Sequence, residues 1–150
     1  MRIAVDVGTV RVGVAASDPA ATLAFPVTVL RRDRRGGADV AELTTLVRDR
    51  DVVEVVVGLP QTLAGRDSAS TTDARNYAGA VASAVAPVPV RLLDERLTTV
   101  TAARQLREAG RDARTGRGVV DAAAAVVLLE SALERERATG EPAGELVVPQ

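Results

Sequence analysis

Apolar and polar residues form short β-branched runs in the first part of the chain and helical patterns farther on. Two runs near the N-terminus are joined by Gly8-Thr9-Val10, a connection short enough for a β-hairpin. A later run, from Val52 to Pro60, ends in Gly-Leu-Pro and is typical of a strand buried on both faces. The pattern predicts five strands, over residues 1–7, 11–17, 26–30, 52–60 and 89–95.

Four other segments carry apolar residues at the spacing of an amphipathic helix. They are residues 38–50, about 72–85, 97–110 and 119–137. Three consecutive strands followed by alternating helices and strands predict a mixed α/β sheet with helices on its faces. We expect one domain over residues 1–137 and a loose C-terminal tail over residues 138–150.

Composition narrows the classes of protein. A length of 150 residues suits a single domain, and no apolar stretch approaches the roughly 20 residues of a membrane span. We therefore expect a cytoplasmic protein without a membrane partner. The chain has no cysteine and no histidine, which excludes thiolate zinc sites, cysteine nucleophiles and catalysis based on imidazole. Any enzymatic chemistry must rest on carboxylates, which could bind a hard metal cation that prefers oxygen ligands.

The charge is balanced overall but unevenly distributed. A formal net charge of -1 does not by itself indicate a nucleic-acid-binding protein. All 19 basic residues are arginine, a side chain suited to bidentate phosphate contacts, and they gather in residues 31–35 and 104–117. These clusters are either contacts for nucleic acid or ordinary solvated surface.

Three acidic positions are unusual for a purely structural role. Asp6 stands inside the first apolar run, Asp94 and Glu95 lie where the last predicted strand ends, and Asp121 lies in the first turn of an apolar helix. Each also has a structural explanation: Asp6 could accept hydrogen bonds from a turn, Asp94 could cap or turn the chain, and Asp121 could interact favourably with the helix dipole. Together, on elements that could converge, they suggest a site for two divalent cations about 4 Å apart, which can clamp a phosphodiester. A bound cation would explain why a carboxylate is tolerated inside an apolar strand.

Four sequence blocks carry a family resemblance: IAVDVGTVRVGVAASD, VVVGLP, LLDERLTTV and VDAAAAVVLLE. Together they resemble the YqgF/RuvX family, whose members are described as Holliday junction resolvases and as pre-16S ribosomal RNA nucleases. The resemblance implies an RNase H-like α/β fold, with a five-stranded mixed sheet and helices on both faces. It also implies a phosphodiesterase site with Mg²⁺ or Mn²⁺, as two ions, held by Asp6, Glu95 and Asp121.

The resemblance also implies residues that contact the substrate. Gly8 would let the backbone approach a phosphate or turn with positive φ. The alternative for Arg11 is a solvated hairpin residue, and the alternative for Arg96 is a pair with Asp94. A lysine that the family often has before its last acid is absent here, so Arg114 or Arg117 would replace it. The full set of expected substrate contacts is Gly8, Thr9, Arg11, Arg96, Arg114 and Arg117.

The expected function is a metal-dependent nuclease that hydrolyses phosphodiester bonds in the 5′ processing of pre-16S rRNA. The alternatives are a Holliday junction resolvase acting on branched DNA, and a non-catalytic nucleic-acid-processing partner with the same fold. The hairpin at Asp6-Val7-Gly8-Thr9 also resembles that of the sugar kinase, actin and heat-shock ATPase group, which needs two such domains. The expected partner is nucleic acid, either structured RNA or branched DNA. The sequence leaves open whether the protein is a monomer or a homodimer.

Overall fold

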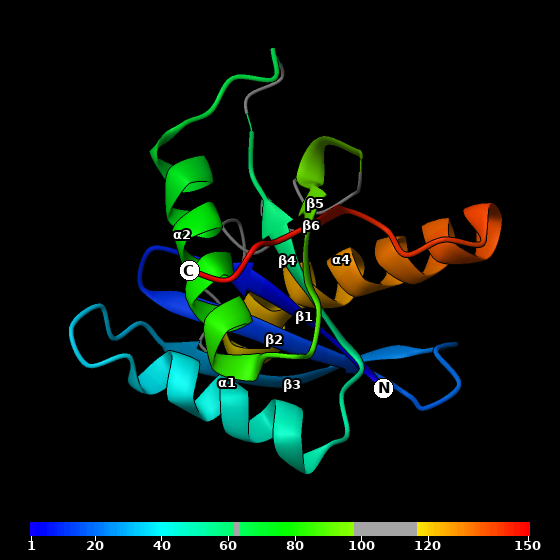
Figure 1. Ribbon diagram of the computed structural model, residues 1–150, viewed down its shortest axis with the longest axis horizontal. Coiled ribbons are helices and arrows are strands. Elements are labelled where there is room, and N and C mark those ends of the chain that lie inside the picture. The colour runs from blue at the N-terminus through cyan, green and yellow to red at the C-terminus, as the bar shows by residue number, and fades with distance from the viewer. Residues whose placement is uncertain (62–63, 98–116) are drawn as a thin grey trace.

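The structure is a computed structural model that describes residues 1–61, 64–97 and 117–150 (Figure 1). The predicted helix over residues 97–110 falls, apart from its first residue, outside the described residues. The strands are β1 (Arg2–Val7), β2 (Arg11–Ser17), β3 (Ala24–Arg31), β4 (Glu54–Leu59), β5 (Val90–Asp94) and β6 (Glu145–Leu146). The helices are α1 (Ala38–Asp49), α2 (Ala69–Val85), the short 3₁₀ helix η1 (Glu95–Leu97) and α4 (Arg117–Thr139).

The strands form one six-stranded mixed sheet in the order β3-β2-β1-β4-β5-β6. Antiparallel pairing joins β1 to β2 and β2 to β3, as the three consecutive strand patterns predict. Parallel pairing joins β1 to β4 and β4 to β5. The carboxyl ends of β1, β4 and β5 therefore meet at one edge of the sheet, called the carboxyl edge below.

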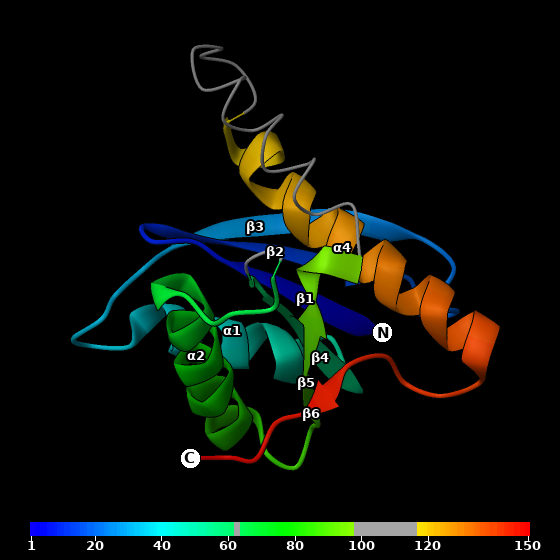
Figure 2. The same ribbon diagram turned by 90° about the horizontal axis from the view of Figure 1, so that it is seen from above.

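Helices cover both faces of the sheet, as predicted (Figure 2). On one face, α1 and α2 pack on side chains such as Val5 and Val57, which alternate along their strands. On the other face, α4 packs its small and branched residues on Ala4, Ala15 and Val56. Alternate residues of one strand thus face opposite sides of the sheet, one set toward α1 and α2 and the other toward α4.

The C-terminal segment adds one strand to the mixed sheet predicted from the sequence. The expected loose tail returns to the sheet, and residues 145–146 pair with β5 as a sixth strand instead of the five expected. Gly144, at φ 94°, makes the turn possible, because a Cβ there would meet the Leu92 carbonyl oxygen at 2.5 Å. At the end of the chain, Ser83 Oγ of α2 donates to the Gln150 carbonyl oxygen at 2.8 Å. Two strand residues are too few to leave an alternation in the sequence.

The second helix begins earlier than its apolar pattern indicates. It starts at Ala69 because Ser68 caps it: Ser68 Oγ accepts a hydrogen bond from the Thr71 backbone N–H at 3.3 Å. In return the Ser68 backbone N–H donates to Thr71 Oγ1 at 2.9 Å, which completes a capping box. Among the described residues, no helix is long and apolar enough to cross a membrane.

Candidate functional site

Asp6 lies near the end of β1 on the face covered by α4. Its side chain is only 1% exposed. It alternates with Ala4, which belongs to the core beneath α4, and it pairs in register with Gly13 of β2. The strand pattern around Asp6 therefore buries a carboxylate at the carboxyl edge, in the layer between the sheet and α4.

Glu95 is buried in the same layer, at the end of β5. It is the first residue of η1 and is 3% exposed. Gly58 of β4 makes room for it, because a Cβ at that position would overlap Glu95 Oε1 and approach Leu128 Cδ2 of α4 to 3.3 Å. The carboxylate of Glu95 therefore lies over the bare backbone of β4, between the sheet and α4.

The register places Asp6 and Glu95 on the two strands that flank β4. Val5 pairs with Val57, so Asp6 and Gly58 are the next residues of neighbouring parallel strands. Leu59 pairs with Asp94, and Glu95 directly follows. Two buried carboxylates thus approach the carboxyl edge from either side of a residue without a side chain. Their hard oxygen donors fit a divalent cation such as Mg²⁺ or Mn²⁺.

The third expected ligand, Asp121, belongs to α4, but its side chain is not among those described. Without that side chain, the described part of the structure contains no group of three acidic residues that could hold a metal ion. Two of the three predicted carboxylates, Asp6 and Glu95, thus lie in the same layer, and the metal-binding role of all three stays a prediction.

Asp94 and Arg96 form an ion pair, which was the alternative foreseen for Arg96. Arg96 Nη2 lies 2.5 Å from Asp94 Oδ2, and Arg96 Nε donates to both carboxylate oxygens. Hydrogen bonds from Arg96 lower the pKa of the Asp94 carboxyl. Asp94 therefore forms an ion pair with Arg96 at the start of η1, whereas its neighbour Glu95 is buried beneath α4.

The hairpin between β1 and β2 explains why residue 8 is glycine. The Gly8 backbone N–H donates to the Arg11 carbonyl oxygen at 2.8 Å, and a Cβ on Gly8 would come within 2.6 Å of that oxygen. Gly8 does not have the positive φ that the sequence analysis offered as one explanation. Glycine is needed at this position because the Arg11 backbone approaches so closely. Thr9 and Arg11 are exposed beside Asp6, and their contact with substrate stays a prediction.

Arg32 supports this hairpin, a role that sequence reasoning missed. Its guanidinium donates to both Asp73 oxygens of α2, at 2.8 and 3.0 Å, and to the Gly8 carbonyl oxygen at 2.9 Å. It also lies over the Tyr77 ring, 5.0 Å from the centroid. Hydrogen bonds from Arg32 lower the pKa of the Asp73 carboxyl. Nothing in the run 31–35 distinguishes Arg32 from its neighbours, so only the folded chain reveals this role.

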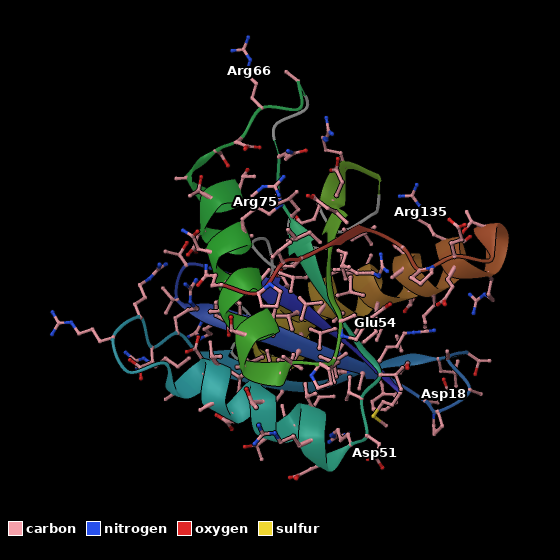
Figure 3. All side chains as sticks on the ribbon, viewed as in Figure 1. Asp18, Asp51, Glu54, Arg66, Arg75 and Arg135 are labelled. Carbon is pink, nitrogen blue, oxygen red and sulfur yellow. The ribbon has the colours of Figure 1, made fainter. Side chains whose placement is uncertain are left out.

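The loop that follows β4 carries a charged residue, Arg66, beyond the carboxyl edge. Figure 3 shows Arg66 at the tip of the loop that follows β4, whereas Asp18, Asp51 and Glu54 lie toward the opposite end of the sheet. Of the other expected contacts, Arg114 lies outside the described residues. Arg117 is the first residue of α4, and its side chain is not described.

A mixed sheet in this order, with helices on both faces, is the RNase H-like fold that the sequence resemblance implied. Among solved structures, RuvC from T. thermophilus in complex with a Holliday junction substrate has a TM-score of 0.57 and 14% identity, and covers 95% of this chain and 99% of RuvC. At that identity the similarity concerns the fold. The family described as "RuvX: Holliday junction resolvase" matches residues 1–135, so the chain belongs to the RuvX family.

Curated relatives agree with this assignment. A protein of Frankia casuarinae is 52% identical over 142 residues, which cover 95% of this chain and 70% of the relative. A protein of Mycolicibacterium paratuberculosis is 53% identical over 144 residues, which cover 96% of this chain and 86% of the relative. Both carry the name "Putative pre-16S rRNA nuclease". The family assignment and the names of these relatives confirm the nuclease class predicted from the sequence.

Proposed function

We propose that this protein is a metal-dependent nuclease that hydrolyses phosphodiester bonds of pre-16S rRNA during 5′ processing. One structural observation supports the hydrolytic site above all others. Asp6 at the end of β1 and Glu95 directly after β5 are both buried in the layer beneath α4, and Gly58 of β4 makes room there for the Glu95 carboxylate. The names of the curated relatives support the choice of RNA.

Asp6, Glu95 and Asp121 would hold one or two Mg²⁺ or Mn²⁺ ions. Support for Asp121 comes from its position in α4: it precedes Ala125 by four residues and Leu128 by seven, and both of those side chains are buried against the sheet. Residues at this spacing follow one another along one face of a helix. Ions held by these carboxylates would supply Lewis-acid chemistry for the hydrolysis of a phosphodiester.

The remaining residues would position the substrate. Arg11 offers a guanidinium to the phosphate backbone at the entrance to the site, where a bidentate contact fixes orientation. The hairpin at Gly8 and Thr9 keeps its shape because Arg32 and Arg34 donate to the Gly8 and Thr9 carbonyl oxygens, at 2.9 and 3.3 Å. A substrate held in a fixed geometry loses less entropy in reaching the transition state.

The test is a cleavage assay on an RNA that carries a pre-16S 5′ leader and on a four-way DNA junction. We expect RNA cleavage with Mg²⁺, loss of cleavage by more than about 1,000-fold in Asp6→Asn, and normal cleavage in the matched variant Asp49→Asn, whose side chain is exposed in the last turn of α1. Cleavage that persists in EDTA or in Asp6→Asn would refute the metal site. Preferential cleavage of the junction would favour the resolvase alternative, which the similarity to RuvC makes relevant.

A further inference from the structure

Two arginines face each other across neighbouring strands at the carboxyl edge. Arg11, the first residue of β2, pairs in register with Arg31, the last residue of β3. Both are exposed. Register partners of an antiparallel pair point to the same face of the sheet, and like charges directly opposite one another destabilise the pair. An anion placed between the two guanidinium groups would offset the repulsion between them and could accept hydrogen bonds from both.

The arginine pair lies on the same face as the buried carboxylates. Asp6 pairs with Gly13, and Arg11 is two residues from Gly13 on the same strand, so Asp6 and Arg11 share a face. With strands about 4.8 Å apart and a rise of about 3.4 Å per residue, Arg11 lies roughly 8 Å from Asp6 and Arg31 roughly 12 Å, measured between Cα positions. These distances correspond to about two to four nucleotides along one strand.

The backbone that carries Arg31 is held firmly in place. The neighbouring Arg32 N–H donates to the Val10 carbonyl oxygen at 2.8 Å, which ties the end of β3 to the hairpin. The Arg32 side chain is only 8% exposed and forms an ion pair with Asp73 at 2.8 Å. Thus Arg32 fixes the loop while Arg31 faces solvent, and a preorganised contact loses less entropy on binding.

We propose that Arg11 and Arg31 together form a binding site for a backbone phosphate, a few nucleotides from the phosphodiester that is cut. The site takes the sugar-phosphate backbone of nucleic acid in general and reads no base. This inference rests on the proposed function for the position of the scissile bond. It assigns to Arg31 a role that separates it from Arg32, although the two residues are adjacent and identical in chemistry.

The test measures binding of a fluorescent RNA duplex by anisotropy, in Ca²⁺ and without turnover, from 50 to 200 mM salt. Each lost phosphate contact lowers the slope of log affinity against log salt by about 0.9 on a duplex. Because the two arginines share one phosphate, we expect a partial fall in slope for Arg31→Ala and for Arg11→Ala, and a fall of about 0.9 for the double variant. Arg31→Lys keeps the charge and retains the wild-type slope. Arg48→Ala, at the opposite end of α1, is the matched control and leaves the slope unchanged.

The inference fails if Arg31→Ala keeps the wild-type slope, or if Arg48→Ala lowers the slope equally. Thermal melting of each variant shows whether it is folded. Should Arg31→Ala not fold, Arg31→Gln keeps the length of the side chain and removes the same charge. Failure of the proposed function is a separate result: a protein that cleaves neither RNA nor junction, yet shows the expected fall in slope, retains the phosphate site and loses the nuclease assignment.

Discussion

Gly58→Ala offers a sharp test of how the site is built, because it adds one methyl group beneath a proposed metal ligand. The new Cβ would overlap Glu95 Oε1 and lie 3.3 Å from Leu128 Cδ2. The Glu95 carboxylate has to retreat by about 1 Å to restore van der Waals contact. A displacement of about 1 Å in a catalytic group can reduce the rate by about 100-fold. We expect a loss of that size in kcat/KM, together with weaker Mg²⁺ binding.

The same substitution has opposing effects on the free energy of unfolding. Replacing glycine in the unfolded chain stabilises the folded state by about 0.4–1 kcal/mol, whereas crowding a packed layer costs about 1–3 kcal/mol. Glu95 Oε1 is the end of a flexible side chain and can move, so we expect a net loss of no more than about 2 kcal/mol. Gly58→Ala should therefore lower kcat/KM strongly while it lowers the free energy of unfolding only modestly.

Two further variants complete this experiment. Gly140→Ala lies after α4 at φ 77° with no atom near the added Cβ, so left-handed strain costs about 1–2 kcal/mol without touching the site. It is the control for lost stability, and we expect full cleavage from it. Glu95→Asp in the Gly58→Ala background shortens the carboxylate side chain and should recover part of the Mg²⁺ affinity. If Gly58→Ala cleaves and binds Mg²⁺ like the wild type, Glu95 does not act from the position described here.

Two other predictions concern the metal and the pH. Ca²⁺ accepts looser oxygen geometry than Mg²⁺, so it should support substrate binding with little cleavage, and substantial cleavage in Ca²⁺ would contradict the assigned ligands. Hydrogen bonds from Arg32 lower the pKa of Asp73 in the folded state, so this pair stabilises the fold above the unfolded pKa of about 3.9 and loses its effect as pH falls through the folded pKa. Asp73→Asn should therefore be less stable than wild type at pH 7 in urea titrations, with a difference that closes toward pH 3; a constant difference would argue against the ion pair.

Much of the fold could be predicted because its elements differ in periodicity. The apolar run before Gly58 is typical of a strand buried on both faces, and it forms β4 in the middle of the sheet. Helix capping and strand pairing between distant segments leave weaker signals in the sequence than periodicity does. Ser68 extended α2 by a capping box whose second member is threonine rather than an acid, and β6 depends on a turn at Gly144 that brings it to β5.

Asp6 could be recognised from the sequence as a candidate metal ligand, because a carboxylate inside an apolar strand has few structural explanations. The choice between Asp94 and Glu95 could not be made from their positions at the end of a strand, and it rested on the family resemblance. The structure separates them physically: Asp94 turns back to the Arg96 guanidinium, and Glu95 enters the layer beneath α4 over Gly58. The decisive feature is a missing side chain on a neighbouring strand, which no local pattern encodes.

The arginine run from residue 31 shows the same limit more clearly. Its residues are equivalent in composition, and the sequence treats them as one basic cluster. Alternation along β3 places Leu30 in the core beside α1 and α2, so Arg31 must face the side of the sheet that also carries Asp6. Arg32 follows the end of the strand and turns to Asp73 of α2. Identical side chains thus have different environments because a strand ends between them: Arg32 holds the hairpin, whereas Arg31 faces solvent on the side of the sheet that carries Asp6.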